Sequence, residues 1–259
     1  MAYPTFDSFS LQDSNYITEQ INYRTIPNRS LDTKKIARKP GVKLLAEDFA
    51  ERTIKLRGYI LGSNISDLKS KIDDLHSNIT RKEDGTLQLE EGRTCTATLA
   101  SIVIADPHYA QDFVPFDLEF LLADPFFYGD QQTVSWTVTS GTSSTSKTIT
   151  ISGTVFAEPS IKYFSPDASG QTTISGVQIE YTTTGESVTW SGTGATTTLA
   201  YSDDLAFDYA NQLILEAITE SDIEGVFSRW EPGSTNFTCT FSGTAPGGSL
   251  NFSYQPRYL

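Results

Sequence analysis

Apolar residues between positions 64 and 79 recur at intervals of three or four. They are Ile65, Leu68, Ile72, Leu75 and Ile79, which share one face of a helix with 3.6 residues per turn. Asn64 is a favourable N-cap, and Asp67 lies near the positive end of the helix dipole. The pattern predicts an α-helix over Asn64–Ile79, ending before the turn signal Asp84-Gly85. Its solvated face is expected to carry the charged residues Lys69, Lys71, Asp73 and Asp74.

Polar and apolar residues alternate in three segments around this helix. The segments are Arg52–Ile60, Thr94–Ala105 and Val114–Leu122. A period of two is typical of strands that bury one face and expose the other. The first part of the chain is therefore predicted to be an α+β domain, with antiparallel strands and one covering helix.

The second half of the chain predicts strands only. Short runs rich in Val, Ile, Thr and aromatic residues recur between turns of Gly, Pro and Ser, which is typical of a sandwich or jelly roll. The runs are Val134–Thr139, Lys147–Ser152, Ser160–Phe164, Thr172–Tyr181, Ser187–Ser191, Thr196–Tyr201, Gln212–Glu216, Asn236–Ser242 and Ser249–Tyr254. The segment Ser140–Ser146 is expected to be a mobile hairpin tip.

Composition changes near residue 130. Residues 1–130 hold 15 Lys and Arg against 20 Asp and Glu, whereas residues 131–259 hold 4 against 12. Ser and Thr supply 42 of the last 129 residues. This shift predicts two domains, residues 1–130 and residues 131–259, with the boundary at Gly129–Gln131.

The net charge of −13 disfavours a nucleic-acid-binding protein, because such binding depends on Lys and Arg that neutralise phosphates. No apolar run approaches the roughly 18 residues that a membrane helix needs. The first residues, MAYPTFDSFS, lack the basic and apolar regions of a signal peptide. We therefore expect a protein that is soluble when it is made in a cytoplasm.

The sequence offers little chemistry. It has two histidines, His76 on the predicted helix and His108 in a turn, and both are expected to be structural. A Ser-His-Asp triad would need one of them, and no G-x-S-x-G motif is present. Six acidic residues could in principle hold calcium, but they are expected to be solvated surface residues. They are Asp203, Asp204, Asp208, Glu220, Asp222 and Glu224. We predict no catalytic residue, no cofactor and no metal site.

Two residue types leave alternatives open. Cys95 and Cys239 are expected to be buried free thiols, since a disulfide would need an oxidising compartment. The three tryptophans, Trp136, Trp190 and Trp230, all lie in the second half. Buried core residues are the favoured interpretation, and a sugar-stacking site is the alternative.

Several motifs together resemble the distal tail proteins of siphophages. In the first half they are the lead-in and strand Gly41–Ile60, the helix Ile65–Ile79, the hairpin Gly85-Thr86-Leu87 and the junction Ala123–Tyr128. In the second half they are Gly153–Ile161, similar to the opening of the family's C-terminal domain, and the turn Gly225–Asn236. Ser234-Thr235 lengthens that turn relative to the usual Pro-Gly-x-Asn, which affects only the local loop.

The resemblance implies a structural role in the tail of a long-tailed phage. Residues 1–130 would form a hexameric "belt" ring at the distal end of the tail tube, and residues 131–259 a galectin-like β-sandwich outside it. The ring would join the tube protein to tail-tip, hub or baseplate proteins, with the tape measure protein as a further candidate partner, and surround the DNA channel. It implies a virion protein that is not an enzyme. The alternative is a carbohydrate- or receptor-binding module of a baseplate.

A ring around DNA also predicts the charge of its lumen. A basic wall would hold phosphates, so we expect the first domain to line the channel with a net acidic surface. Its basic residues are then expected to face neighbouring subunits or rings; they are Arg24, Arg29, Lys34, Lys35, Arg38 and Lys39.

Overall fold

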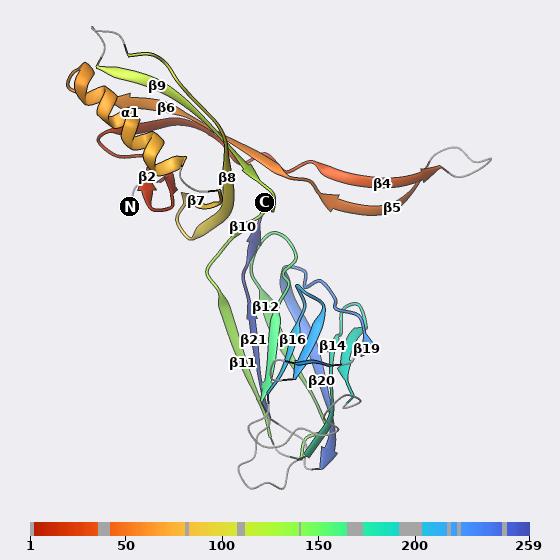
Figure 1. Ribbon diagram of the computed structural model, residues 1–259. Helices are drawn as coiled ribbons and strands as arrows, with labels where there is room; N and C mark the ends of the chain where they lie inside the picture. The colour runs from red at the N-terminus through yellow and green to blue at the C-terminus, as the bar shows by residue number, and fades with distance from the viewer. Residues whose placement is uncertain are drawn as a thin grey trace. The chain divides into compact units, whose positions relative to one another are not determined.

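The computed structural model describes residues 3–35, 42–80, 83–107, 112–139, 141–164, 173–191, 204–216, 219–221, 224–244 and 248–259. The chain divides into two compact units, Met1–Tyr128 with Leu259, and Gly129–Tyr258. Within the described ranges the molecule is mostly β, with one helix (Figure 1).

The N-terminal unit is built on an antiparallel sheet with the order β2-β1-β7-β8-β9-β6-β3, and β10 pairs with β8. The strands are β1 (Thr5–Phe6), β2 (Phe9–Ser10), β3 (Tyr16–Asn22), β6 (Arg52–Leu61), β7 (Gly85–Glu90), β8 (Arg93–Ile104), β9 (Phe113–Leu122) and β10 (Phe127–Tyr128). The long strand β8 pairs with β7 through its first half and with β9 through its second. Strict alternation in β6 and β9 buries one face of each strand, as the sequence pattern predicts.

The predicted helix is confirmed as α1, Ile65–Ile79, which lies alongside β6 in Figure 1. The Asn64 side chain accepts hydrogen bonds from the backbone N–H groups of Ser66 and Asp67 and so caps the helix. Leu68, Leu75 and Ile79 are buried, while Ile65 and Ile72 are half-buried.

The segment between β3 and β6 forms a hairpin that the hydrophobic pattern does not predict. Strands β4 (Arg29–Lys35) and β5 (Val42–Phe49) pair only with each other and make a separate two-stranded sheet (Figure 1). All seven residues of β4 are exposed. The alternation of buried and exposed positions that identifies a strand in a sequence is therefore missing here.

The C-terminal unit contains two antiparallel sheets, and the described part of it has no helix. The first has the order β11-β21-β13-β16-β17-β18 and the second β12-β20-β14-β15-β19. Their strands are β11 (Gln132–Val138), β12 (Ser144–Ile151), β13 (Ser160–Phe164), β14 (Thr173–Tyr181), β15 (Glu186–Trp190), β16 (Asp204–Asp208), β17 (Leu213–Glu216), β18 (Thr219–Ser221), β19 (Glu224–Gly225), β20 (Gly233–Thr244) and β21 (Gly248–Tyr254), with the short β22 (Arg257–Tyr258) near the end of the chain. Side chains from both sheets meet in one hydrophobic cluster.

Eight of the nine strands predicted for this half overlap observed strands, and the ninth, Thr196–Tyr201, lies outside the described residues. The expected hairpin tip at Ser140–Ser146 needs a correction. Strand β12 begins at Ser144, where Ser144, Thr145 and Ser146 pair with Thr240, Cys239 and Thr238 of β20. A run of Ser and Thr is compatible with a strand when its side chains lie on a solvent-facing surface.

Candidate functional site

Where the structure describes them, the residues weighed for catalysis or metal binding are not grouped into a site. His76 is exposed on α1, and His108 lies outside the described residues. Asp204 and Asp208 lie on β16 and Glu224 on β19, in different sheets, while Asp203 and Asp222 also fall outside the described ranges. Within the described part of the chain, no three His, Cys, Asp or Glu side chains are grouped as a metal site would require.

The cysteines and tryptophans belong to the hydrophobic interior. Cys95 and Cys239 are buried free thiols, as predicted. Burial raises the pKa of Cys95 to about 12 and also raises the pKa of Cys239, so neither thiol forms a reactive thiolate near neutral pH. Trp190 and Trp230 are fully buried and Trp136 nearly so. None of the three therefore offers an exposed ring on which a sugar could stack.

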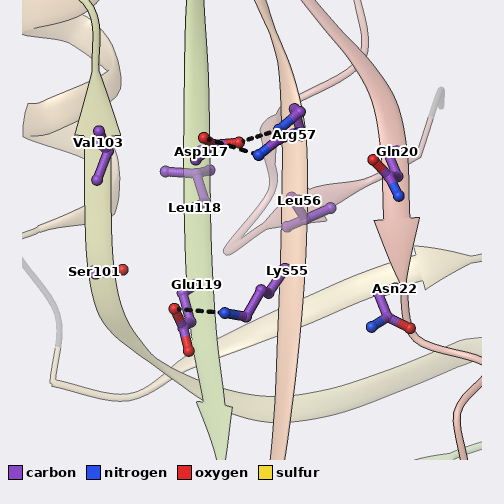
Figure 2. A pocket seen from close by; sticks show the side chains of 10 residues that line it. All are labelled: Gln20, Asn22, Lys55, Leu56, Arg57, Ser101, Val103, Asp117, Leu118 and Glu119. Carbon is purple, nitrogen blue, oxygen red and sulfur yellow. Dashed lines mark hydrogen bonds and ion pairs between the residues drawn. The ribbon is translucent and has the colours of Figure 1, made fainter.

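One face of the sheet formed by β3, β6, β9 and the second half of β8 is lined mainly by polar and charged side chains. A shallow pocket of about 350 Å³ lies on it, lined by Gln20, Asn22, Lys55, Leu56, Arg57, Ser101, Val103, Asp117, Leu118 and Glu119 (Figure 2). The alternation of β6 and β9 points the neighbouring residues Leu56 and Leu118 toward the buried side. We call this surface the polar sheet face.

Strand register pairs the charges on the polar sheet face. Lys55 lies opposite Glu119, with an Nζ–Oε2 distance of 3.3 Å, and Arg57 lies opposite Asp117, with an Nε–Oδ1 distance of 2.6 Å. The Asp117 carboxylate raises the pKa of Arg57. Both pairs are largely solvent-exposed, so they add little stability. They leave a line of positive charge along β6 beside a line of negative charge along β9, with no net charge.

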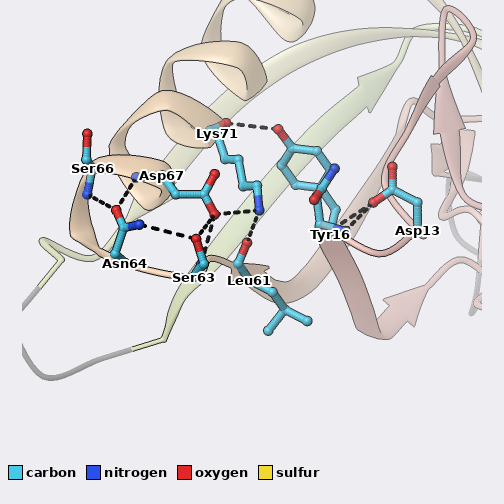
Figure 3. A network of polar contacts seen from close by, with 9 residues as sticks. Asp13, Tyr16, Leu61, Ser63, Asn64, Ser66, Asp67 and Lys71 are labelled. Carbon is cyan, nitrogen blue, oxygen red and sulfur yellow. Dashed lines mark hydrogen bonds and ion pairs between the residues drawn. The ribbon is translucent and has the colours of Figure 1, made fainter.

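A polar network anchors the start of the helix to the sheet (Figure 3). The Asp67 carboxylate accepts hydrogen bonds from Ser63 N–H at 2.8 Å and from Lys71 Nζ at 3.0 Å. Lys71 also donates to the Leu61 carbonyl at 2.8 Å, so the expectation that it lies among the solvated charges is wrong. Its long side chain reaches from the helix back to the end of β6.

Tyr16 ties β3 to the same helix. Its hydroxyl donates to the Lys71 carbonyl at 2.9 Å. Burial, together with the nearby Asp74 and Asp13, raises the pKa of Tyr16 to about 12, so this hydroxyl remains a donor at every physiological pH. The network is structural, because its members are hydrogen-bonded to one another and join β3 and the end of β6 to the helix.

Two features of the N-terminal unit suit contact with another chain. In the described part of the sheet, one edge of β3 has no partner strand, and residues 101–104 of β8 pair with β9 alone. Free edges of this kind present unpaired N–H and C=O groups to other strands. In addition, Ile26, which precedes β4, exposes 62% of its surface, and Leu31 on β4 exposes 55%. No sequence pattern identifies these features, since both depend on what the fold leaves uncovered.

The fold and the family agree on the class of protein. The family model for the phage tail protein RIFT-related domain matches residues 5–153, more than half of the chain, so the chain belongs to this family of phage tail proteins. Its structure is similar to that of the Dit protein of phage SPP1, with a TM-score of 0.72 and 15% sequence identity over 99% of this chain and 98% of that one. The resemblance to siphophage distal tail proteins is thereby confirmed at the level of family and fold.

More distant similarity extends to a chain of the phage P2 baseplate in its activated conformation. The TM-score is 0.44 and the identity 9%, over 96% of this chain and 92% of that chain. No protein of curated function matches the sequence. Among the described residues, no helix has the length and apolar character that crossing a membrane requires.

Proposed function

We propose that this phage tail protein forms a six-membered ring at the distal end of the tail tube, where it joins the tube to the tail tip or baseplate and surrounds the DNA channel. Residues 1–130 would make the ring, and residues 131–259 would form a galectin-like sandwich around it. The SPP1 Dit protein, which shares the fold, is described as a hub of the adsorption apparatus. The partners would be tail tube, tail-tip, hub or baseplate proteins, in a role without catalysis.

The observation that carries the proposal is the hairpin β4–β5. It pairs with no other strand of the described chain and exposes every side chain of β4. An isolated two-stranded hairpin is marginal in water, and an extended exposed hairpin on a folded unit is stabilised when another surface covers it. The free edges of β3 and β8 support the same conclusion. A contact between two different surfaces of identical chains is heterologous and closes into a ring when the rotation between copies permits.

The test is to place a charge on the apolar part of the hairpin. Leu31→Lys leaves the core untouched, because Leu31 is 55% exposed, but it buries a charge if another copy covers β4. We expect the wild-type protein to elute as six chains in size-exclusion chromatography with light scattering. The variant should need a protein concentration at least about tenfold higher to assemble, because a loss of about 1.4 kcal/mol at each contact has this effect.

The matched control is Val226→Lys in the C-terminal unit. Val226 is 57% exposed, so the two substitutions carry the same change of charge at similar exposure. It should assemble as the wild type does. A wild-type protein that stays monomeric at high concentration would contradict the proposal, and so would a Leu31→Lys variant that assembles normally.

A further inference from the structure

Two of the three aromatic residues of the junction Ala123–Tyr128, Phe126 and Phe127, contact the base of the hairpin. The Phe126 ring meets the Phe49 ring edge-on, with centroids 5.4 Å apart, and Phe127 meets Tyr23 in the same way at 6.1 Å. Phe49 is the last residue of β5, and Tyr23 follows β3 on the way into β4. The segment that enters the hairpin and the segment that leaves it are therefore both packed on this junction.

The base of the hairpin is also closed upon itself. The backbone N–H of Ala50 donates to the Asn28 carbonyl at 2.8 Å, which joins the two chain segments just outside the paired strands. The Arg29 guanidinium lies over the Phe49 ring, 5.3 Å from its centroid. Movement of either strand of the hairpin must therefore move Phe49, which carries the contact to Phe126.

Arg52 of β6 also contacts the junction. Its guanidinium lies over the Phe127 ring at 5.0 Å and donates to the Pro125 carbonyl at 3.4 Å. The residue is only 5% exposed, burial lowers its pKa, and its Nη2 atom has no hydrogen-bond partner among the described residues. This buried cation, held largely by an aromatic face, joins β6 to the junction, and the rings of the junction in turn contact Tyr23 and Phe49.

We propose that this cluster, Tyr23, Phe49, Arg52, Phe126 and Phe127, couples the hairpin to the connection between the two units. A neighbouring copy that fixes the hairpin also fixes Phe49 and Tyr23, and these hold the junction rings. The connection to the C-terminal unit is then stiffer in the assembled ring than in the free chain. The ring-dependent half of this inference rests on the proposed function, whereas the coupling itself is a property of the single chain.

Hydrogen exchange on the full-length chain, at a concentration at which light scattering shows it unassembled, tests the coupling in the monomer. Phe49→Leu removes the edge-to-face contact from the hairpin side and Phe126→Leu removes it from the junction side, while both keep an apolar side chain. Coupling is reciprocal, so Phe49→Leu should speed exchange of the amides of Phe127 and Tyr128, and Phe126→Leu should speed exchange at Ala50. Loss of one edge-to-face contact predicts roughly 2- to 12-fold faster exchange.

Phe9→Leu is the matched control, because it removes a similar edge-to-face contact, with Tyr16 at 5.2 Å, outside the cluster. It should leave both reporter regions unchanged. The coupling would be overturned if the reporter amides responded to Phe9→Leu as strongly as to the other two variants. It would also be overturned if they responded to none of the three variants.

The assembled protein tests the second half. Assembly of the wild type should slow exchange of the Phe127 and Tyr128 amides as well as those of the hairpin. In Phe126→Leu the hairpin should still be protected on assembly, but the junction should not. Protection of the hairpin without any change at the junction in the wild type would overturn the inference, whereas a wild type that never assembles would contradict only the proposed function.

Discussion

Single residues carry constraints that the hydrophobic pattern does not reveal, and Gly58 is one of them. It is buried in β6 between β3 and β9, opposite Thr18 and Phe116. A Cβ atom at this position would lie 2.1 Å from the Ile17 carbonyl oxygen and 2.8 Å from the Phe116 ring. The first of these contacts is with backbone, which cannot swing aside as a flexible side chain can. Glycine is therefore required here by close approach.

Gly58→Ala should lower the free energy of unfolding by about 3 kcal/mol, because an atom is forced into an occupied space. Denaturant unfolding followed by circular dichroism measures the change. Tryptophan fluorescence should be affected much less, since all three tryptophans lie in the C-terminal unit. Gly176→Ala is the control: its Cβ would be 3.4 Å from the nearest atom, and the effect should stay within about 1 kcal/mol. An unchanged stability of Gly58→Ala would contradict the close approach.

The elements differ in how far the sequence predicts them. Helix α1 is predictable because its cap, its periodicity and its charges all act within one segment. Strands β6 and β9 are predictable because each alternates, but the ion pairs of the polar sheet face are not. Lys55 and Glu119 are far apart in the chain and meet only through strand register. Strand β4 of the hairpin shows no alternation of buried and exposed positions, because all of its residues are exposed.

The start of α1 predicts a dependence of stability on pH. The Ser63 backbone N–H, and next the Lys71 ammonium, lower the pKa of the Asp67 carboxyl below its ordinary value of 3.8. A group whose pKa is lower in the folded state stabilises that state above its unfolded pKa, about 3.9, and loses this contribution as pH falls through the folded pKa. Asp67→Asn should therefore lower the melting temperature at pH 7, and the difference from wild type should shrink below about pH 4.

Asp73→Asn serves as the control, because Asp73 is an exposed carboxylate of the same helix. It should change the melting temperature little at any pH. A difference between wild type and Asp67→Asn that persists unchanged in acid would mean that the Asn side chain disturbs the helix start itself, and the electrostatic explanation would fail.

At the scale of the whole molecule, the net charge of the chain affects how DNA would interact with a channel through a ring of copies. Six copies of a chain with net charge −13 hold −78 formal charges. The sequence predicts a net acidic wall, but the polar sheet face has balanced pairs, so a wall made from it would be neutral. A neutral wall would also let DNA pass, because strong DNA binding needs Lys and Arg side chains that neutralise phosphates and release their counterions. The basic residues expected to face neighbouring subunits or rings are exposed where the structure describes them: Arg24 follows β3, and Arg29, Lys34 and Lys35 lie on β4. Arg38 and Lys39 lie outside the described residues.

The net charge of the polar sheet face can be made positive or negative without altering the core. Asp117→Lys with Glu119→Lys adds +4 per chain, or +24 in a ring of six, and Lys55→Glu with Arg57→Glu subtracts the same amount. Each double variant places like charges opposite one another across β6 and β9, so the structural penalty is matched. If the face lines the channel, both variants should assemble, and only the first should retain duplex DNA, with a binding constant that falls steeply between 50 and 200 mM salt, on the order of 10³-fold or more. Loss of assembly in both variants would place the face between subunits instead, and assembly of the positive variant without DNA retention would place it away from the channel.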